Sequence, residues 1–398
     1  MQYRYVPKNG DKLSALGFGA MRLPSRRMGI DEERATKQIR SAIDGGVNYI
    51  DTADPYHGGE SERFIGRALK DGYRDKVKIA TKLPPWSVRT REDMDLILSI
   101  QLKKLGTDHI DYYLLHGLDA NNWKKLYELG ILEFLDAAKT SGKIINAGFS
   151  FHGDRKTFKE IIDAYDWIFC QIQYNFLDEQ NQAGTEGLQY AASKNIAVMI
   201  MEPLRGGMLA GKLPKDVKEI YDRAKTQRSA AEWGLRWVWN HQEVTVVLSG
   251  MNDEKHIEEN IRTCETALPG SMTADDLATV ESVAGVYNRQ IRIGCTGCAY
   301  CMPCPFGVNI PQNFFLYNGY FMGNKLMSRG FYGLTLMGGM GERADAALCR
   351  DCGKCAKACP QKIAIPDELR NVRRTLGGLR TKIMIPLVKM MFSGEVKE

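Results

Sequence analysis

Short apolar runs alternate with helical segments along most of the chain. Each run has six or seven residues, rich in β-branched and aromatic types, and ends at turn-forming residues, which predicts strands. The runs are Leu13–Phe18, Val47–Thr52, Val77–Lys82, Ile110–His116, Ile144–Phe149, Ile168–Gln173, Ile196–Met201 and Val244–Ser249. Apolar residues at helical spacing separate them. Eight strands that alternate with helices predict an α/β fold, a closed parallel (β/α)8 TIM barrel.

The chain begins with a predicted hairpin. Tyr3–Val6 and Leu13–Phe18 flank the turn-forming pair Asn9-Gly10, so the second hairpin strand is also the first barrel strand. A doubly wound sheet is the competing architecture. It needs a Gly-rich phosphate loop after its first strand, and the residues there do not make one.

Four ionisable residues lie at the ends of three successive predicted strands. They are Asp51 and Tyr56 after one strand, Lys82 at the end of the next, and His116 at the end of the third. Strand ends of this kind form the active site of a (β/α)8 barrel. Any one of the four alone is more simply read as a structural ion pair or a core residue, but together they favour a functional site.

The four side chains suit proton transfer to a carbonyl. A phenol titrates near pH ~10, but an ammonium group held against it and braced by a carboxylate stabilises the phenolate. Tyr56 could then exchange a proton near neutral pH, with Lys82 and Asp51 tuning it. His116 could polarise a carbonyl oxygen through a hydrogen bond.

The stretch GVNYIDTADPYHGGESE, residues 46–62, resembles a motif of the aldo-keto reductases. The resemblance covers roughly residues 12–290. It implies a hydride transfer between a nicotinamide cofactor and a small-molecule carbonyl or alcohol substrate. It also implies that Asp51, Tyr56, Lys82 and His116 form a catalytic tetrad in which Tyr56 is the proton donor.

Two late loops suit a nucleotide. The loop Pro203, Leu204, Gly206 and Gly207 offers backbone N–H groups to a pyrophosphate, and Arg205 adds positive charge. Ser249 and Gly250 precede a predicted helix, Glu254–Ala267, whose N-terminus could bind a second anionic group.

The resemblance assigns further nucleotide contacts. It implies that Ser150 and Gln171 hold the carboxamide of nicotinamide and that Tyr174 stacks on its ring. It also implies that Glu259 and Asn260 approach the adenine. Trp86, just after Lys82, plausibly walls the substrate pocket, and a plain packing role is an equal alternative.

Two departures from the family pattern leave the nucleotide open. Ser150 is followed by Phe151 where the family commonly has asparagine, and the positions of the usual 2'-phosphate clamp hold Gly250 and His256. The cofactor is therefore NADP or NAD, because Lys255 or Arg262 could replace the clamp.

Length and charge indicate a second domain. A barrel of about 250 residues leaves over a hundred of the 398 unexplained. Residues 286–398 carry 16 Lys and Arg against 7 Asp and Glu, whereas residues 1–285 have a net charge of −3. No leader and no apolar stretch of spanning length is found, which predicts a cytoplasmic protein.

Eight cysteines in the basic part form two runs. Cys295, Cys298, Cys301 and Cys304-Pro305 form the first, and Cys349, Cys352, Cys355 and Cys359-Pro360 the second. The second run has the bacterial ferredoxin spacing, and the first differs by one residue before its last cysteine. Disulfides are unexpected in a cytoplasmic chain, and zinc usually takes two CxxC pairs. Cys170 and Cys264 are isolated and are expected to be buried.

The spacing indicates two 4Fe-4S clusters with crossed ligands. Three cysteines of each run reach one cluster, and the cysteine before each proline reaches the other. Cys359 would then join the first three cysteines, and Cys304 would join Cys349, Cys352 and Cys355. The negative clusters would offset about half of the local positive charge, which favours this explanation over nucleic-acid binding. The arrangement resembles a subgroup of aldo-keto reductases fused to a ferredoxin-like domain, common in anaerobes.

Three segments are therefore expected. Residues 1–288 form the barrel and 289–375 the ferredoxin-like domain, with an aromatic and Met-rich insertion at 310–345 that packs the clusters, covers the substrate or docks a partner. Residues 376–398 form a basic and apolar tail; Pro386 breaks any long amphipathic helix, so membrane contact is not expected.

Three functions remain open from the sequence. The first is an NAD(P)-dependent oxidoreductase whose clusters are structural or regulatory, and the intact tetrad favours it. The second is a reductase that takes electrons through the clusters from a ferredoxin-type partner. The third is a redox-sensing or electron-transfer protein with a non-catalytic barrel.

Overall fold

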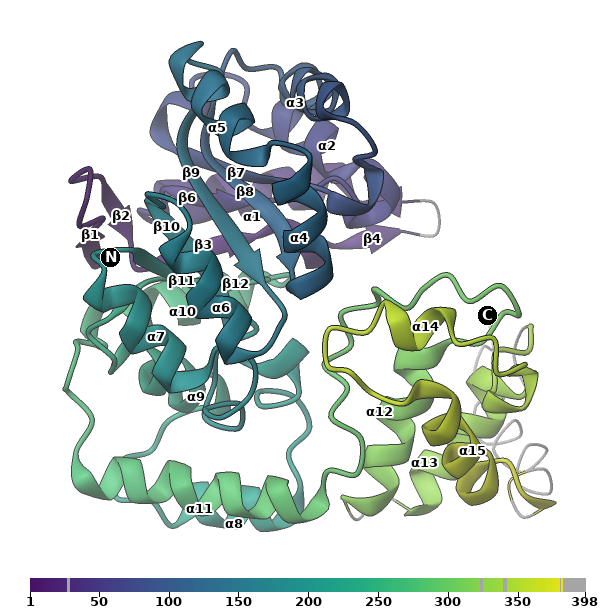
Figure 1. Cartoon of the computed structure of the whole chain (residues 1–398). Helices are drawn as coiled ribbons and strands as arrows, with labels where there is room; N and C mark the ends of the chain where they lie inside the picture. Colours follow the sequence, from purple (N-terminus) through teal and green to yellow (C-terminus); the bar gives the residue numbers. More distant parts are fainter. Residues whose placement is uncertain (27–28, 323–324, 339–341, 380, 382–398) are drawn as a thin grey trace, which may run out of the picture. The chain divides into compact units, whose positions relative to one another are not determined.

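The computed structural model describes residues 1–26, 29–322, 325–338, 342–379 and 381 (Figure 1). The chain divides into two compact units. The first unit comprises Met1–Leu204 and Arg228–Val280, and the second comprises Arg205–Gln227 and Glu281–Glu398. Within the described part of the chain, no helix is long and apolar enough to cross a membrane.

The first unit is built on a closed barrel of eight parallel strands, as predicted. Around the barrel the order is β10-β11-β12-β3-β6-β7-β8-β9. In chain order the strands are β3 (Leu16–Gly19), β6 (Tyr49–Asp51), β7 (Lys78–Leu83), β8 (Ile110–Leu118), β9 (Ile144–Phe151), β10 (Phe169–Gln173), β11 (Ala197–Met201) and β12 (Val244–Ser249). Because all strands run the same way, their carboxyl ends open at one face, where barrel enzymes place their chemistry.

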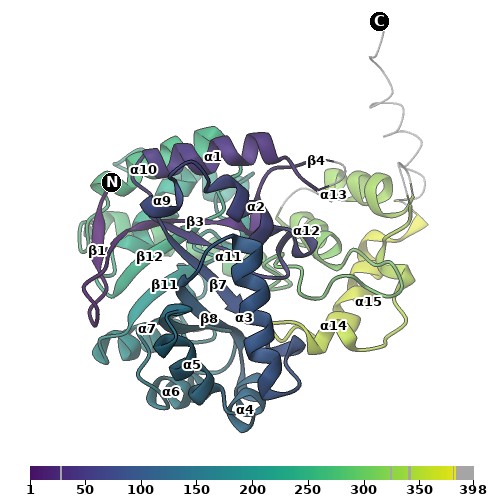
Figure 2. The same cartoon turned by 90° about the horizontal axis from the view of Figure 1, so that it is seen from above.

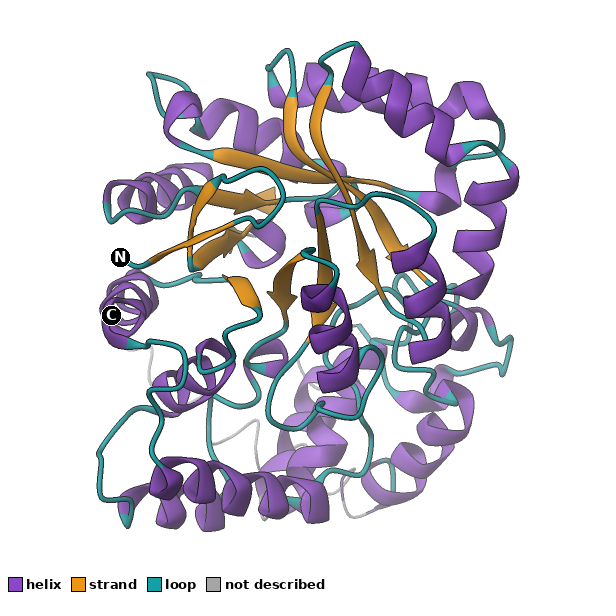
Figure 3. Ribbon diagram, turned by 60° about the vertical axis from the view of Figure 1, so that its left-hand side comes forward, coloured by secondary structure: helices purple, strands orange, loops and turns teal. Residues whose placement is uncertain are grey.

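Helices surround the strands of this unit (Figures 2 and 3). They are α1 (Glu32–Asp44), α2 (Ser61–Ala68), α3 (Arg91–Leu105), α4 (Ala120–Glu128), α5 (Ile131–Thr140), α6 (Arg155–Asp163), α7 (Gly184–Ser193), α9 (Ala230–Trp239) and α10 (Glu254–Thr266). Several begin at an aspartate or serine whose side chain accepts a backbone N–H, such as Asp119 before α4 and Asp154 before α6. The apolar face of each helix packs on the strands.

The predicted strand Leu13–Phe18 is two strands in the structure. β2 (Lys12–Ser14) pairs antiparallel with β1 (Tyr3–Tyr5), and β3 then enters the barrel. The break lies at Ala15, whose N–H donates to Gln2 O at 2.9 Å while its carbonyl accepts from Val247 N of β12 at 2.8 Å. Ala15 therefore separates the hairpin strand from the barrel strand. The sequence does not show this break, because the apolar run is continuous across it.

The second unit contains the cysteines and an apolar core of its own. Its helices are α8 (Lys215–Asp222), α12 (Ile310–Phe321), α13 (Lys325–Phe331), α14 (Lys354–Lys357) and α15 (Ile365–Leu376), and the long helix α11 (Ala274–Gln290) enters it from the first unit. Phe314, Tyr317 and Tyr332 of the predicted insertion pack with Leu369 and Val372 of α15. Three described aromatic residues of the insertion therefore help to build the core of this unit, whereas Phe315 and Phe331 are exposed. The predicted tail, apart from residues 376–379 and 381, lies outside the described residues.

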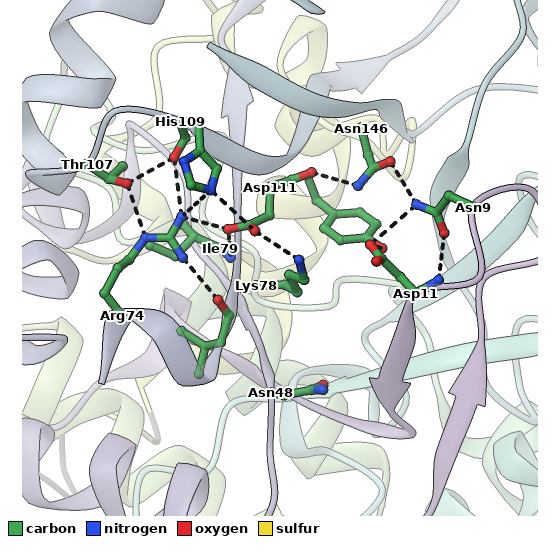
Figure 4. A network of polar contacts seen from close by, with 12 residues as sticks. Asn9, Asp11, Asn48, Arg74, Lys78, Ile79, Thr107, His109, Asp111 and Asn146 are labelled. Atoms are coloured by element: carbon green, nitrogen blue, oxygen red, sulfur yellow. Dashed lines mark hydrogen bonds and ion pairs between the residues drawn. The ribbon is translucent and has the colours of Figure 1, made fainter. Parts of the chain in front are cut away.

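A polar network joins residues near the amino-terminal ends of the strands, opposite the carboxyl ends (Figure 4). Asp111 of β8 accepts hydrogen bonds from Arg74 at 2.8 Å and from the backbone N–H of Ile79 at 3.0 Å. Its carbonyl accepts from Asn146 at 3.0 Å, and Asn146 in turn accepts from Asn9 of the hairpin turn at 2.8 Å. The network thus ties three strands to the hairpin at the end where a barrel keeps its stabilising residues.

We expect replacement of Asp111 with Ala to destabilise the barrel. The Asp111 carboxylate is buried, with a side chain 4% exposed, and its loss leaves the Arg74 cation without its carboxylate partner and the Ile79 N–H without its acceptor. Breaking such a pair should lower the free energy of unfolding by about 3 kcal/mol. Urea unfolding followed by tryptophan fluorescence measures the change.

The matched control is Asp95→Ala, which removes the exposed ion pair of Asp95 with Arg91 on α3. This change should cost less than about 1 kcal/mol. Equal small effects of the two substitutions would show that the network does not stabilise the barrel.

Candidate functional site

A buried ion pair lies at the carboxyl ends of β6 and β7. Lys82 Nζ donates to Asp51 Oδ2 at 2.6 Å and to the carbonyl oxygen of Thr52 at 2.9 Å. The two side chains are only 1% and 4% exposed. Burial lowers the pKa of Lys82, and the neighbouring Asp51 carboxylate acts in the opposite direction. The pair therefore holds an ammonium group in a place that water does not reach.

Tyr56 lies beside this pair. The Lys82 ammonium nitrogen is 5.2 Å from the centre of the Tyr56 ring. The following turn has left-handed backbone at His57 (φ 53°), Gly58 (φ 66°) and Gly59 (φ 95°), which reverses the chain into α2. The sequence YHGG thus holds the phenol at the mouth of the barrel.

His116 of β8 completes the predicted tetrad. Its ring lies edge-on to Tyr56, with 6.2 Å between the ring centres, and 5.1 Å from the half-exposed ring of Trp86. Burial lowers the pKa of His116 well below its usual value, and the charge of Lys82 lowers it further. The imidazole is therefore neutral at physiological pH and able to act as a hydrogen-bonding group. The structure brings all four predicted residues together.

A second carboxylate, Glu62 of α2, supports the site from behind. It is fully buried and accepts hydrogen bonds from Thr81 at 2.7 Å, Gln101 at 2.8 Å and Lys104 at 3.2 Å. Gln101 also donates to the carbonyl oxygen of Lys82 at 2.9 Å. Sequence reasoning missed these residues, because polar side chains on predicted helices resemble a solvated face.

Lys104 links the same network to the Tyr56 loop. Its ammonium group donates to Asp54, two residues before Tyr56, at 2.6 Å, as well as to Glu62. One face of α3, through Gln101 and Lys104, therefore holds both the strand that carries Lys82 and the loop that carries Tyr56.

A second histidine lies near His116. His152, after β9, is nine-tenths buried, and its presence contributes to the lowered pKa of His116. Its Nδ1 lies 3.1 Å from Gln182 Oε1, so this nitrogen carries the proton. Burial lowers the pKa of His152 to about 4. The sequence does not reveal a role for His152, because a single histidine in a loop forms no recognisable pattern.

The predicted carboxamide contacts are neighbours in the structure. Gln171 of β10 pairs in register with Ser150 of β9. Ser150 Oγ accepts the backbone N–H of Gly117 at 2.7 Å. Gln171 Oε1 is buried and has no hydrogen-bond partner among the described residues, which makes it an acceptor suited to an amide N–H.

The predicted residues near β12 are also close to one another. Asn260 of α10 is buried and donates to Ser249 Oγ at 3.1 Å, and Glu259 accepts a hydrogen bond from Ser229. The side chain of Arg22 packs against Gly250, since a Cβ at Gly250 would lie 3.3 Å from Arg22 Cβ. A cationic residue therefore adjoins the position where the expected phosphate clamp is missing.

The remaining predicted nucleotide residues differ in their surroundings. Pro203 and Leu204 follow β11 in the first unit, and Arg205 and Gly207 belong to a turn assigned to the second unit, with Arg205 at φ 48° and Gly207 at φ 94°. Tyr174 is fully buried, its hydroxyl group 2.8 Å from Thr185 and its ring 5.1 Å from that of Trp237. These contacts place Tyr174 between α7 and α9, and its stacking on nicotinamide stays a prediction.

The cysteines of the second unit form two groups that cross between the runs. Burial raises the pKa of Cys301 to about 12, and the nearby thiolates of Cys298, Cys295 and Cys359 raise it too. These four cysteines line one cavity. Among the described residues, no three or more His, Cys, Asp or Glu side chains are arranged to hold a single metal ion.

The other group contains Cys304. Burial raises the pKa of Cys349 and that of Cys355, and a nearby Cys304 thiolate raises both further. Cys352 also raises the pKa of Cys349, and Cys349 raises that of Cys355. Cys304 therefore lies with the second run, as Cys359 lies with the first. Cys170 and Cys264 are buried, as predicted.

Comparison with known proteins identifies both parts of the chain. The model of the aldo/keto reductase family matches residues 15–283, and that of the 4Fe-4S dicluster domain matches residues 294–364. L-glyceraldehyde 3-phosphate reductase of Escherichia coli O157:H7 is 25% identical over 328 residues, covering 71% of this chain and 92% of that protein. Methylglyoxal reductase YeaE of E. coli K12 is 26% identical over 291 residues, covering 69% and 94%.

A solved structure has the same barrel. The aldo-keto reductase from Klebsiella pneumoniae in complex with NADPH matches with a TM-score of 0.58 at 22% identity, covering 71% of this chain and 96% of that one. At this identity the likeness shows the fold.

We expect His152 to make the barrel less stable as the pH falls. An unfolded histidine titrates near ~6.5, whereas burial lowers the pKa of His152 to about 4. Between these values the unfolded chain binds a proton that the folded chain does not, so the free energy of unfolding decreases as pH falls below ~6.5. At pH ~5 the loss due to His152 is roughly 2 kcal/mol.

The test compares urea unfolding at neutral and acidic pH for the His152→Asn variant. Its stability loss on acidification should be smaller than that of the wild type by this amount. The control is His256→Asn, at an exposed position of α10, which should match the wild type. An unchanged pH dependence in His152→Asn would contradict the assignment.

Proposed function

The chain belongs to the aldo/keto reductase family, and on that premise we propose that it transfers hydride between a nicotinamide dinucleotide and the carbonyl group of a small molecule, with Tyr56 as proton donor. One observation carries the proposal. The buried ammonium group of Lys82, 2.6 Å from Asp51, lies beside the ring of Tyr56 at the carboxyl ends of the strands. That arrangement lowers the cost of forming a phenolate.

Each residue of the tetrad then has one role. When bound, a dihydronicotinamide supplies hydride to the carbonyl carbon. Tyr56 gives its proton to the carbonyl oxygen, and the positive charge of Lys82 stabilises the phenolate that remains. Asp51 keeps Lys82 charged and in place. Neutral His116 donates a hydrogen bond that orients the carbonyl and polarises it. The oxidation of an alcohol uses the same groups in reverse.

The described residues fit a nicotinamide dinucleotide. The buried acceptor Gln171 Oε1 suits the amide N–H of the carboxamide, and Ser150 is its neighbour. Ser249, Gly250, Glu259 and Asn260 would bind the adenosine half, and the loop Pro203, Leu204, Arg205 and Gly207 the pyrophosphate. NADP is the preferred nucleotide in this proposal, because Arg22 adjoins Gly250 and a related structure contains NADPH.

The substrate class follows from the relatives. Proteins that are named as reductases of L-glyceraldehyde 3-phosphate and of methylglyoxal match most of the barrel sequence. Both compounds are small aldehydes with a second oxygen function next to the carbonyl. Small α-oxygenated aldehydes are therefore the first substrates to test.

The second unit would hold two 4Fe-4S clusters with crossed ligands. Cys295, Cys298, Cys301 and Cys359 would bind one, since they line one cavity. Cys304 would join Cys349, Cys352 and Cys355 on the other, because its thiolate acts on both Cys349 and Cys355. Thiolates are the usual ligands of such clusters, which supply one-electron transfer when bound. We assign residues 289–375 to this domain and residues 1–288 to the barrel.

Replacing Tyr56 with Phe removes the proton donor and keeps the ring. Turnover of methylglyoxal should fall by about 10²–10⁴-fold, the usual contribution of a general acid. Nucleotide affinity, measured by quenching of protein fluorescence, should stay nearly unchanged. Tyr127→Phe, at an exposed position of α4, serves as the matched control. Retained turnover in the Tyr56→Phe variant would rule out Tyr56 as the donor.

Replacing Cys304 with Ala tests the crossed ligands. The wild type should contain about eight irons per chain, and the variant about four, if the cluster that Cys304 shares with the second run is lost. Cys170→Ala, at a buried position of β10, should leave the iron content unchanged. Electron paramagnetic resonance of the reduced protein shows which cluster remains. Loss of both signals together, or of neither, would contradict the pairing.

A further inference from the structure

The two cysteine runs differ sharply in charge. Residues 294–307, which contain the first run, include no Asp, Glu, Lys or Arg. Residues 349–362, which contain the second run, include four cationic residues, Arg350, Lys354, Lys357 and Lys362, and a single anionic one, Asp351. The positive charge is therefore concentrated around the second of the two cysteine runs.

The four cations are exposed and have no ion pair among the described residues. Asp351 does not neutralise them, because it is paired with Arg370 at 2.7 Å. Most cations on the helices of the barrel, by contrast, have a carboxylate partner, as Lys37 has Glu33 on α1 and Lys159 of α6 has Glu186. Positive charges left without partners along the second cysteine run indicate a surface that attracts an anionic partner.

Solvent access also differs between the two groups. Cys352 is exposed, whereas the other seven cysteines of the two runs are at least partly covered. The cavity of Cys295, Cys298, Cys301 and Cys359 is lined by apolar residues, among them Phe314 and Ile365. Electron transfer to a cluster requires close approach of the carrier, and the second group contains the exposed cysteine, Cys352.

We propose that the surface formed by Arg350, Lys354, Lys357 and Lys362 docks a small acidic one-electron carrier protein, which exchanges electrons with the cluster of Cys304, Cys349, Cys352 and Cys355. The inference rests on the proposed function, because it requires that the clusters are bound. In each encounter one electron passes from the reduced carrier to the oxidised cluster, and no bond forms or breaks.

The physics of encounter supports a protein partner of negative charge. A cluster of thiolates and iron carries net negative charge and would repel an acidic carrier. Unpaired cations along the second run reverse the local potential and raise the association rate, an effect that salt screens. Lys354 and Lys357 are three residues apart on α14, so they share one face of that helix.

The test uses the complete, cluster-loaded chain and an acidic bacterial-type ferredoxin with two 4Fe-4S clusters as the probe. Stopped-flow mixing follows reduction of the chain by reduced ferredoxin, and calorimetry follows binding. The charge-reversal variant carries Lys354→Glu and Lys357→Glu. The control carries Lys215→Glu and Lys218→Glu, the same charge change at exposed positions of α8 in the same unit.

The charge-reversal variant should react at least about tenfold more slowly than the wild type at about 0.01 M salt, where the Debye length is about 30 Å. The difference should shrink at about 0.1 M salt, where that length is about 10 Å. The control should match the wild type. Iron content and the final extent of reduction by dithionite should be the same in all three proteins.

Three results would overturn the inference while the clusters are intact. The first is a wild type that dithionite reduces but reduced ferredoxin does not. The second is equal ferredoxin rates in all three proteins. The third is tight binding of single-stranded RNA that the charge reversal abolishes while the ferredoxin rate stays unchanged. Absence of iron and of cluster spectra would instead contradict the proposed function itself.

Discussion

The ion pair between Lys82 and Asp51 is the interaction on which the rest of the barrel site depends. Removing an ammonium group from water costs several kcal/mol, so a buried lysine stays charged only if acceptors replace the water. Asp51 at 2.6 Å and the Thr52 carbonyl at 2.9 Å are those acceptors. The positive charge of Lys82 also acts on Tyr56, whose ring centre is 5.2 Å from the ammonium nitrogen. A buried charge that would be a liability in a core thus becomes a means of adjusting a phenol.

The barrel supplies the rigidity that this pair needs. Adjacent parallel strands carry Asp51 and Lys82, and the network of Glu62, Gln101 and Lys104 holds their surroundings from the side of the helices. At the opposite end, Asp111 and its partners fix the bottoms of the strands and the hairpin. Small displacements of a reacting group are costly for catalysis, so these polar contacts outside the tetrad matter for the chemistry. In the proposed function, clusters bound by the second unit would add one-electron chemistry to the same chain.

The sequence predicts the barrel, and also that Asp51, Tyr56, Lys82 and His116 lie together, because both follow from local pattern. Alternating apolar runs mark the strands, and polar residues at their ends mark the site. It fails where partners are distant in the chain. The break at Ala15 depends on two hydrogen bonds to Gln2 and Val247, and no local signal shows it. Glu62 and Gln101 look like surface residues until α2 and α3 pack together. The insertion gives no amphipathic pattern, because α12 buries residues on several faces. Its aromatic residues therefore suggest a lid or an interface as readily as the core they form.

The source of the hydrogen on the product carbon distinguishes hydride transfer in the barrel from separate delivery of electrons and protons. The cluster-loaded protein is incubated with an aldehyde substrate and with nucleotide deuterated at both positions of C4, in ordinary water. Hydride transfer places one deuterium on the former carbonyl carbon in this experiment, and unlabelled nucleotide in D2O places none there. Product without deuterium on that carbon, formed instead with solvent deuterium when the reaction is run in D2O, would contradict it. In that case electrons and protons would reach the substrate separately, and the barrel would not transfer hydride.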